Sequence, residues 1–340
     1  RQKIEDELKE KVALARSLEA LLKDPRKMLE LIKKEMLEIK EKYGDTRRTK
    51  VVKHSPKEFS EEDLIPDEEI VVMVTRGGYV KRIKPENYRM QKRGGKGLIG
   101  IETKEEDVVQ HLLICSTHSQ LLFFTDLGKV YQIRAYEIPE GTRVSKGRAI
   151  FNFISVNQSE RVTSILAISQ FKPGRKEKSV TSEKRYIVML TESGIIKKIA
   201  ASEFDQVRRS GLIAITLRKG DALRWARLTT GADDLILVTS TGQAVRFQEK
   251  EVRAMGRQAA GVTAIRLKGI DRVVGMDVIE PGNAQSKVLH LLVVTERGFG
   301  KQTPVKQFKR QRRGGSGIKT VKITPKTGPM IGASMIREEE

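Results

Sequence analysis

One stretch of the chain combines three cations with three glycines and has no apolar side chain: Gln91, Lys92, Arg93, Gly94, Gly95, Lys96 and Gly97. Glycine loses more backbone entropy on ordering than any other residue, so the stretch predicts a surface loop instead of a helix or strand. Exposed N–H groups and cations together bind anions, and the phosphate backbone of DNA or RNA is the obvious candidate. A solvated glycine turn with incidental charge is the alternative interpretation.

The charge of the whole chain points to the same kind of partner. The 340 residues carry a formal net charge of +21. Residues 71–340 contain 48 Lys and Arg against 26 Asp and Glu, so the positive excess belongs to this part. A strongly basic domain is typical of a protein that binds a polyanion.

The composition also bears on compartment and domain number. The single cysteine, Cys115, excludes an internal disulfide and fits a reducing compartment. No apolar run approaches the roughly 20 residues that span a bilayer, and the N-terminus has no signal-peptide core. We expect a soluble, cytosolic chain with one large or two ordinary domains.

The first part of the chain predicts helices followed by a linker. Apolar residues at helical spacing and a proline that follows Asp24 predict two helices that end at Gly44. We expect residues 1–43 to form a coiled-coil-like α-helical segment cut from a larger unit. Residues 44–69 break the periodicity and contain acidic runs, which predicts a linker.

From residue 70 onward the pattern changes to a repeat. Five units of eleven residues pair an apolar strand and Thr-x-x-Gly with a second strand: 73–83, 123–133, 189–199, 237–247 and 293–303. Each predicts a β-hairpin with a left-handed glycine in its turn. The turn glycines are Gly78, Gly128, Gly194, Gly242 and Gly298.

A second glycine follows each turn glycine by 17 or 19 residues and begins another apolar strand. These second glycines are Gly97, Gly147, Gly211, Gly261 and Gly317. Each unit then ends in a further strand, so it holds about four strands. Four-stranded units repeated at this scale predict a mainly β, propeller-like array of blades over residues 70–340.

The repeat places arginines in equivalent loops. Four residues before the second glycine lie Arg93, Arg143, Arg257 and Arg313, and Arg208 and Arg209 lie close to that position in the third unit. Equivalent loops of a circular array share one edge, so we expect a cationic rim that holds and bends duplex DNA by its phosphates. The expected rim residues are Lys81, Arg82, Arg143, Lys146, Lys197, Lys198, Arg208, Arg209, Arg246, Arg257, Lys301, Arg312 and Arg313. Arginine also suits any exposed turn, which is the alternative.

These residues resemble a known family. Gln91–Gly97 resembles the gyrase A box of DNA gyrase A subunits, with Lys92 where the family more often has arginine. Residues 29–49 are similar to the end of the breakage-reunion core in those proteins, and residues 62–83 to the entry into their C-terminal domain. The resemblance covers nearly the whole chain and implies a β-pinwheel, a six-bladed propeller-like disc that exchanges strands between blades. Residues 311–317 are box-like too, but Ser316 replaces the lysine of the box.

The resemblance implies a DNA-wrapping function. In this family duplex DNA wraps chirally around the rim without sequence preference, which supports ATP-dependent negative supercoiling by a type II topoisomerase. The implied partners are duplex DNA and, within an A2B2 enzyme, the gyrase B subunit together with another gyrase A chain. ATP and Mg²⁺ are implied for the core and for the B subunit, with no cofactor in this chain. The implied location is the bacterial cytoplasm, in association with the nucleoid.

The chain also departs from the family pattern. None of its six tyrosines lies in a stretch that resembles the family's catalytic site, so we expect DNA binding without cleavage. Only five hairpin units are present, and residues 335–340 lie where a sixth blade would begin.

Three alternatives follow from other interpretations of the same residues. The C-terminal domain of the topoisomerase IV A subunit is the nearest, because it shares the fold but usually lacks an intact box and wraps DNA less strongly. A propeller that serves as a protein-interaction scaffold is the second, although such a scaffold needs no large positive charge. An enzyme site is the third and is disfavoured, because the four histidines are scattered and no Walker-type loop is present.

Overall fold

The computed structural model describes residues 1–45, 64–87, 107–142, 145–157, 159–168, 185–280 and 289–337. The stretch Gln91–Gly97 and Arg143 lie outside the described residues. The chain divides into two compact units, Arg1–Phe59 and Ser60–Glu340. Each unit is described by itself below.

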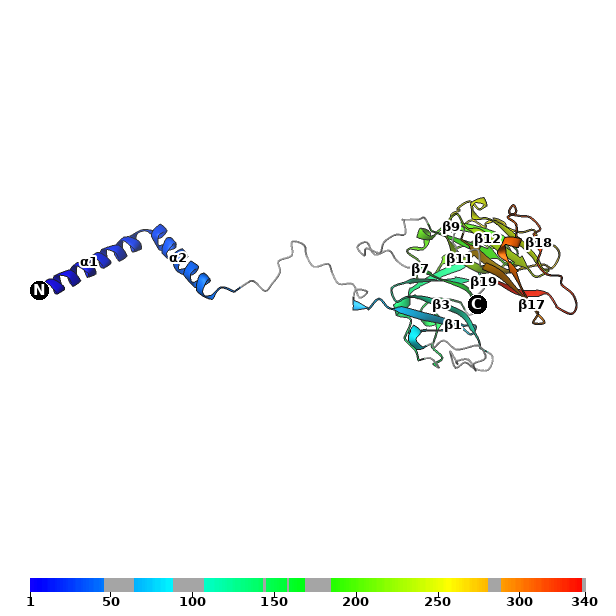
Figure 1. Cartoon of the computed structure of the whole chain (residues 1–340), viewed down its shortest axis with the longest axis horizontal. Coiled ribbons are helices and arrows are strands. Elements are labelled where there is room, and N and C mark those ends of the chain that lie inside the picture. The colour runs from blue at the N-terminus through cyan, green and yellow to red at the C-terminus, as the bar shows by residue number, and fades with distance from the viewer. Residues whose placement is uncertain are drawn as a thin grey trace. The chain divides into compact units, whose positions relative to one another are not determined.

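The first unit contains two helices, α1 (Gln2–Lys23) and α2 (Pro25–Tyr43) (Figure 1). The Asp24 side chain accepts a hydrogen bond from the Arg26 amide at 3.0 Å, and Pro25 is the first residue of α2, as the sequence predicts. Neither helix buries a residue, and most apolar side chains of both are exposed. Among the described residues, no helix combines the length and the apolar character needed to cross a membrane.

The second unit is a five-bladed β-propeller made of small antiparallel sheets. The first blade contains β1 (Glu69–Thr75), β2 (Tyr79–Ile83), β3 (Val109–Ser116) and β6 (Arg148–Ala149). The second contains β4 (Gln120–Thr125), β5 (Lys129–Arg134), β7 (Val162–Ile168) and β10 (Leu212–Ile213). The third contains β8 (Tyr186–Thr191), β9 (Ile195–Ala200), β11 (Leu223–Thr229) and β14 (Val262–Thr263).

The last two blades follow the same plan. The fourth contains β12 (Asp234–Thr239), β13 (Gln243–Gln248), β15 (Val273–Ile279) and β18 (Ile318–Lys319). The fifth contains β16 (Leu289–Thr295), β17 (Gly300–Pro304) and β19 (Met330–Arg337). Short 3-10 helices follow the hairpins: η2 (Pro85–Asn87), η3 (Ala135–Glu137), η5 (Ala201–Phe204), η6 (Glu249–Glu251) and η8 (Val305–Gln307), with η4 (Ile150–Asn152) after β6.

The first four blades each receive a strand from the following repeat unit. β6 pairs with β2, β10 with β5, β14 with β9 and β18 with β13. The same hydrogen bond recurs at 2.8 Å at all four junctions, joining the amides of Ile150, Ala214, Ala264 and Thr320 to the carbonyl oxygens of Gly78, Gly128, Gly194 and Gly242. The exchange of strands between blades is therefore confirmed, and backbone hydrogen bonds tie each of these blades to the next.

The second glycine of each described unit makes the exchange possible. Gly147, Gly211, Gly261 and Gly317 all have left-handed backbones, with φ between 77° and 92°. A Cβ atom at Gly261 would lie 2.6 Å from the carbonyl oxygen of Ile196 in the receiving strand. Only glycine combines this backbone conformation with such a close approach.

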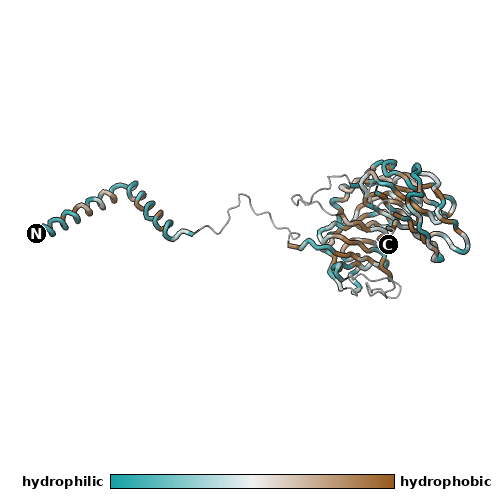
Figure 2. The backbone as a smooth tube through the Cα atoms, in the orientation of Figure 1, coloured by the Kyte–Doolittle hydropathy of each residue, from teal (hydrophilic) through white to brown (hydrophobic). Residues whose placement is uncertain are grey.

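The hydrophobic core lies between neighbouring blades. In β4, Leu121 and Phe123 pack in one cluster with residues of the first blade, whereas Leu122 and Phe124 pack in another with residues of the third. Successive side chains of a strand point to opposite faces, so a strand buried on both faces must be apolar throughout. This burial explains the continuous apolar runs of the hairpin strands, visible as the brown segments of Figure 2.

The last strands of the repeat units face the middle of the propeller. β7 packs between β3 and β11, and β15 packs between β11 and β19. The exchanged strands lie at the opposite end of the strand order in their sheets, and hence on the outer edge.

The structure differs from the sequence-based expectations at the C-terminal end of the propeller and in the linker. Residues 335–337 belong to β19 and pair with β16, so they complete the fifth blade and do not begin a sixth. Part of the expected linker is attached to the first blade, because Glu68 and Pro66 exchange hydrogen bonds with Thr117.

Cys115 is buried in β3. Its burial raises the pKa of the thiol to about 11, so the thiol stays protonated at neutral pH. A protonated thiol is a poor nucleophile.

We expect Gly261→Ala to lower the free energy of unfolding by about 1–3 kcal/mol, because alanine is strained at this φ and its Cβ meets the Ile196 carbonyl. Chemical denaturation of the two proteins measures the difference. Gly256→Ala is the matched control, since a Cβ there would meet no atom within 4 Å and its φ is not left-handed. Equal stability of the Gly261→Ala variant and the parent would refute this account of the strand exchange.

Candidate nucleic-acid interface

The described arginine loops lie on the outer edge of the propeller, because each leads directly into an exchanged strand. The loop of the third unit contains Arg208 and Arg209, that of the fourth contains Arg257, and that of the fifth contains Arg312 and Arg313. All but Arg313 are exposed. The structure thus brings together on one edge the loops that the sequence predicts to be equivalent.

Each arginine loop runs beside the segment that follows the preceding exchanged strand. The Thr216 amide donates to the Ala259 carbonyl at 3.4 Å, and its hydroxyl donates to the Gln258 carbonyl at 2.7 Å. The Arg266 amide donates to the Gly315 carbonyl at 3.0 Å in the next junction. The loops and these intervening segments therefore form one continuous surface.

The intervening segments carry exposed cations that were not among the expected rim residues. They are Arg218, Lys219, Arg266 and Lys268. A signal for them exists in the sequence, because Arg218 and Lys268 both lie seven residues after the second glycine of their units.

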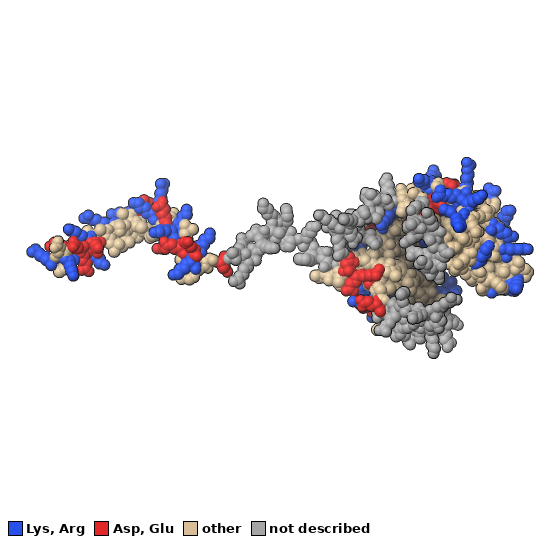
Figure 3. Space-filling view, in the orientation of Figure 1, with Lys and Arg blue, Asp and Glu red and all other residues tan. Residues whose placement is uncertain are grey.

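We call the resulting surface the cationic strip. It consists of eight exposed residues: Arg208, Arg209, Arg218, Lys219, Arg257, Arg266, Lys268 and Arg312. Figure 3 shows Lys and Arg side chains gathered over the blades that Figure 1 colours yellow to red. A groove of about 780 Å³ opens within the strip, lined by Glu203, Leu212, Gly256 and Arg257 among others. The strip can bind an extended polyanion through several phosphates at once.

Three of the expected rim lysines lie in the interior. Lys81 and Lys197 are fully buried, and Lys198 is 6% exposed. They extend from strands that are covered by the neighbouring blade, so the ammonium groups bond to protein atoms. The expectation that these three lysines lie on an exposed rim is therefore wrong.

The buried lysines hold the arginine loops in place. The ammonium of Lys81 donates to the carbonyls of Thr142 and Ser145, at 3.1 and 2.8 Å. That of Lys197 donates to the carbonyl of Ala214 at 2.6 Å and to the carbonyl of Arg257. Burial lowers the pKa of Lys81, and it lowers that of Lys197 to about 8. In both cases the lysine of one blade fixes the loop that docks on it.

Lys198 belongs to a buried ion pair between the third and fourth units, and Arg246 to one within the fourth blade. The Lys198 ammonium lies 3.6 Å from the buried carboxylate of Glu249. The Arg246 guanidinium lies 2.6 Å from Asp234, whose side chain is 1% exposed, and it also donates to the carbonyl of Phe308 at 3.3 Å. The partners of both cations point to structural roles.

Four further expected rim residues are half-buried or exposed. Arg82 and Arg313 are half-buried, and the Arg82 carbonyl accepts a hydrogen bond from Gly141 at 2.9 Å. Lys146 places its ammonium 4.0 Å from the ring centre of Tyr79. Lys301 is exposed and donates to the carbonyl of Thr320 at 3.1 Å.

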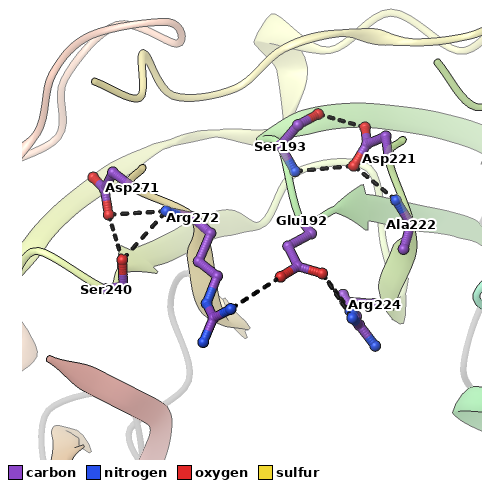
Figure 4. Close-up of polar contacts among 8 residues, drawn as sticks. All are labelled: Glu192, Ser193, Asp221, Ala222, Arg224, Ser240, Asp271 and Arg272. Atoms are coloured by element: carbon purple, nitrogen blue, oxygen red, sulfur yellow. Dashed lines mark hydrogen bonds and ion pairs between the residues drawn. The ribbon is translucent and has the colours of Figure 1, made fainter. Parts of the chain in front are cut away.

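The hairpin turns, at the other end of the strands, have a different electrostatic character. Glu192 forms ion pairs with Arg224 at 2.7 Å and with Arg272 at 3.7 Å (Figure 4). Asp221 accepts hydrogen bonds from the Ser193 and Ala222 amides, and Asp271 does the same in the fourth blade. Carboxylates thus fix the turns. Within the described part of the chain, no group of three or more His, Cys, Asp or Glu could hold a metal ion.

We expect the stability of the protein to depend on Lys197 above pH 8. Between pH 8 and 10.5 the unfolded chain holds a proton on this lysine that the folded chain has lost, so the free energy of unfolding rises with pH. The rise is measured as the difference between the protein and its Lys197→Met variant in denaturation at several pH values. Lys301→Met is the control, because Lys301 has the equivalent position in the fifth unit but is exposed. A pH-independent difference would contradict the prediction.

Comparisons with known proteins agree with this architecture. The family model described as DNA gyrase C-terminal domain, beta-propeller, matches residues 69–116, 119–169, 185–230, 233–280 and 289–336. Over all 340 residues the chain is 39% identical to the DNA gyrase A subunits of Staphylococcus epidermidis and Staphylococcus aureus. It spans 37% of the length of these relatives.

Two solved structures are similar at comparable levels, and a third supports the fold alone. The C-terminal domain of DNA topoisomerase IV has a TM-score of 0.63 and 26% identity, with 80% of this chain and 79% of that chain covered. The DNA gyrase A C-terminal domain has a TM-score of 0.62 and 28% identity, with 80% and 84% covered. The E. coli ParC C-terminal domain has a TM-score of 0.55 and 14% identity, with 79% and 99% covered. From the match of the family model to all five blades, we conclude that the chain belongs to the DNA gyrase C-terminal domain family of β-propellers.

Proposed function

We propose that this chain binds duplex DNA without sequence preference, bends it and wraps it chirally around the outer edge of the propeller. The observation that carries the proposal is the cationic strip, in which eight exposed cations follow one edge across successive blade junctions. Such a row neutralises phosphates and releases counterions, which gives affinity without reading bases.

The energetics of bending are compatible with such a strip. Smooth bending of a short duplex by roughly 40–90° costs on the order of 1–6 kcal/mol. A hydrogen bond to a charged group contributes about 1.5–3 kcal/mol. A few phosphate contacts along the strip therefore offset the cost of bending.

The proposal extends to a parent enzyme. The chain would act within a bacterial, cytoplasmic and nucleoid-associated DNA gyrase, in an A2B2 assembly with another gyrase A chain and with the B subunit. Residues 1–43 would be the end of the breakage-reunion core and residues 44–69 the linker. The core would supply the catalytic tyrosine and, together with the B subunit, would bind ATP and Mg²⁺ for negative supercoiling. This chain would contribute DNA binding.

The similarity to the topoisomerase IV domain supports one alternative function. Its TM-score of 0.63 is as high as the 0.62 of the gyrase A domain. The alternative is a domain that binds DNA but does not wrap it strongly, and it differs from the first proposal in its effect on DNA topology.

We expect the chain to change the linking number of plasmid DNA. The chain is bound to relaxed circular plasmid, a type I topoisomerase relaxes the free part, and the linking number is read after the protein is removed. A shift that grows with added protein supports chiral wrapping. We expect alanines at all of Gln91–Gly97 to abolish the shift while DNA binding persists. Binding by the parent without any shift would favour the alternative, and a shift by the alanine variant would refute the role of the box.

We expect the triple variant Arg209→Gln, Arg257→Gln and Arg312→Gln to bind DNA more weakly and with less salt dependence. Each full phosphate contact contributes about −0.9 to the slope of log affinity against log salt, so the loss of three contacts flattens it by up to about 3. Fluorescence anisotropy with a labelled mixed-sequence duplex measures the slope. A variant with three helix cations replaced, Arg16→Gln, Lys27→Gln and Lys33→Gln, controls for net charge. An unchanged slope in the first variant would place these arginines away from the DNA.

A further inference from the structure

Three glutamates occupy the same position in successive repeat units. Glu137, Glu203 and Glu251 each lie nine residues after the turn glycine, in the 3-10 helices η3, η5 and η6. These helices follow the hairpin strand on which the next exchanged strand docks. The glutamates therefore lie at the outer edge, beside the arginine loops.

Each of these glutamates contacts the arginine loop of the next unit. Glu137 lies 3.7 Å from the Arg209 guanidinium, and Glu203 lies 3.7 Å from the Arg257 guanidinium. Glu251 contacts the loop differently, since it accepts a hydrogen bond from the Arg313 amide at 2.8 Å. The same pairing of a carboxylate with an arginine loop thus recurs at three successive junctions of the described chain.

The Glu203–Arg257 ion pair is loose and exposed. Its distance of 3.7 Å exceeds that of a charge-assisted hydrogen bond, and the two side chains are 50% and 44% exposed. Exposed pairs of this kind contribute little to stability. A DNA phosphate that approaches Arg257 offers shorter, bidentate hydrogen bonds and would displace the carboxylate.

The loop backbone does not depend on this ion pair. Lys197 donates to the Arg257 carbonyl, and Thr216 donates to the adjacent Gln258 carbonyl at 2.7 Å. The guanidinium of Arg257 can therefore change its partner while the loop stays in place.

We propose that Glu203 is a built-in competitor of the DNA phosphates for Arg257, and that Glu137 acts in the same way on Arg209. At a given salt concentration, these carboxylates lower the affinity of the cationic strip for duplex DNA. The inference rests on the proposed function, because it concerns the same strip. It assigns to the two glutamates a role as positioning residues, which act only through their arginines.

The variant Glu203→Gln tests this role without disturbing the fold. Gln307 occupies the same position in the fifth unit, at the end of η8, so glutamine is compatible with this 3-10 helix. Glu137 is less suitable because its carboxylate also accepts the Arg134 amide at 3.0 Å. Glu192→Gln is the matched control, since it removes the same charge from an arginine-paired glutamate in a hairpin turn.

The experiment measures the affinity of the 340-residue chain for a labelled mixed-sequence duplex between about 50 and 200 mM salt. We expect Glu203→Gln to bind about two- to fivefold more tightly at low salt, the range that corresponds to an exposed ion pair. Its salt slope should steepen by up to about 0.9, because Arg257 then neutralises a phosphate fully. In a protein that already carries Arg257→Gln, the same substitution should change nothing.

Each other outcome overturns the inference. An equal gain in Glu192→Gln, or a gain that persists with Arg257→Gln, would assign the effect to net charge alone. Weaker or unchanged binding by Glu203→Gln, in a protein that binds DNA, would refute the competition and leave the proposed function intact. A parent chain that does not bind the duplex would refute the proposed function, and the inference with it.

Discussion

The structure depends on one close approach, that of a left-handed glycine to the outer strand of the preceding blade. At Gly147, Gly261 and Gly317 a Cβ would lie 2.6 Å from a backbone carbonyl oxygen of that strand. The exchanged strands are only two residues long, so they have little pairing energy of their own and need this contact together with the recurring bond to the turn glycine. Because the arginine loop leads directly into the exchanged strand, the same contact determines where the arginines lie.

Burial on both faces of the hairpins explains which cations reach the surface. A strand between two blades has no solvent face, so a lysine within it must satisfy its ammonium inside the protein. Lys81 and Lys197 do so by donating to carbonyls of the incoming loop, with their aliphatic stems in the core. The cations outside the strands have no such constraint. The cationic strip is accordingly built from loops and turns.

The sequence predicts the repeating architecture better than it predicts the surface. Turn glycines, apolar runs and the second glycine each follow from a local requirement, and the structure confirms the hairpins and the blades. The exposure of a cation in a strand is not a local property, because Lys197 is buried by contacts with the Arg257 loop of the neighbouring unit. Strands that are covered on both sides lack the regular alternation of apolar and polar residues that would identify an exposed face. The end of the fifth blade escapes prediction for a similar reason, since only pairing with β16 identifies β19.

In the arginine loop of the fourth unit, the groups that hold the backbone differ from the group that pairs with the arginine side chain. At the junction of the third and fourth units, backbone carbonyls of the loop bind Lys197 and Thr216, whereas the guanidinium of Arg257 meets only a loose carboxylate partner among the ion pairs described. Position and charge are therefore controlled separately. A substitution at Glu203 can change the electrostatic strength of the strip without moving the loop, whereas a change at Lys197 alters the loop itself. Of this arrangement, the loose ion pair recurs at the preceding junction, between Glu137 and Arg209 at 3.7 Å. Under the proposed competition, the edge therefore has a second site at which a carboxylate weakens the attraction of an arginine for a polyanion.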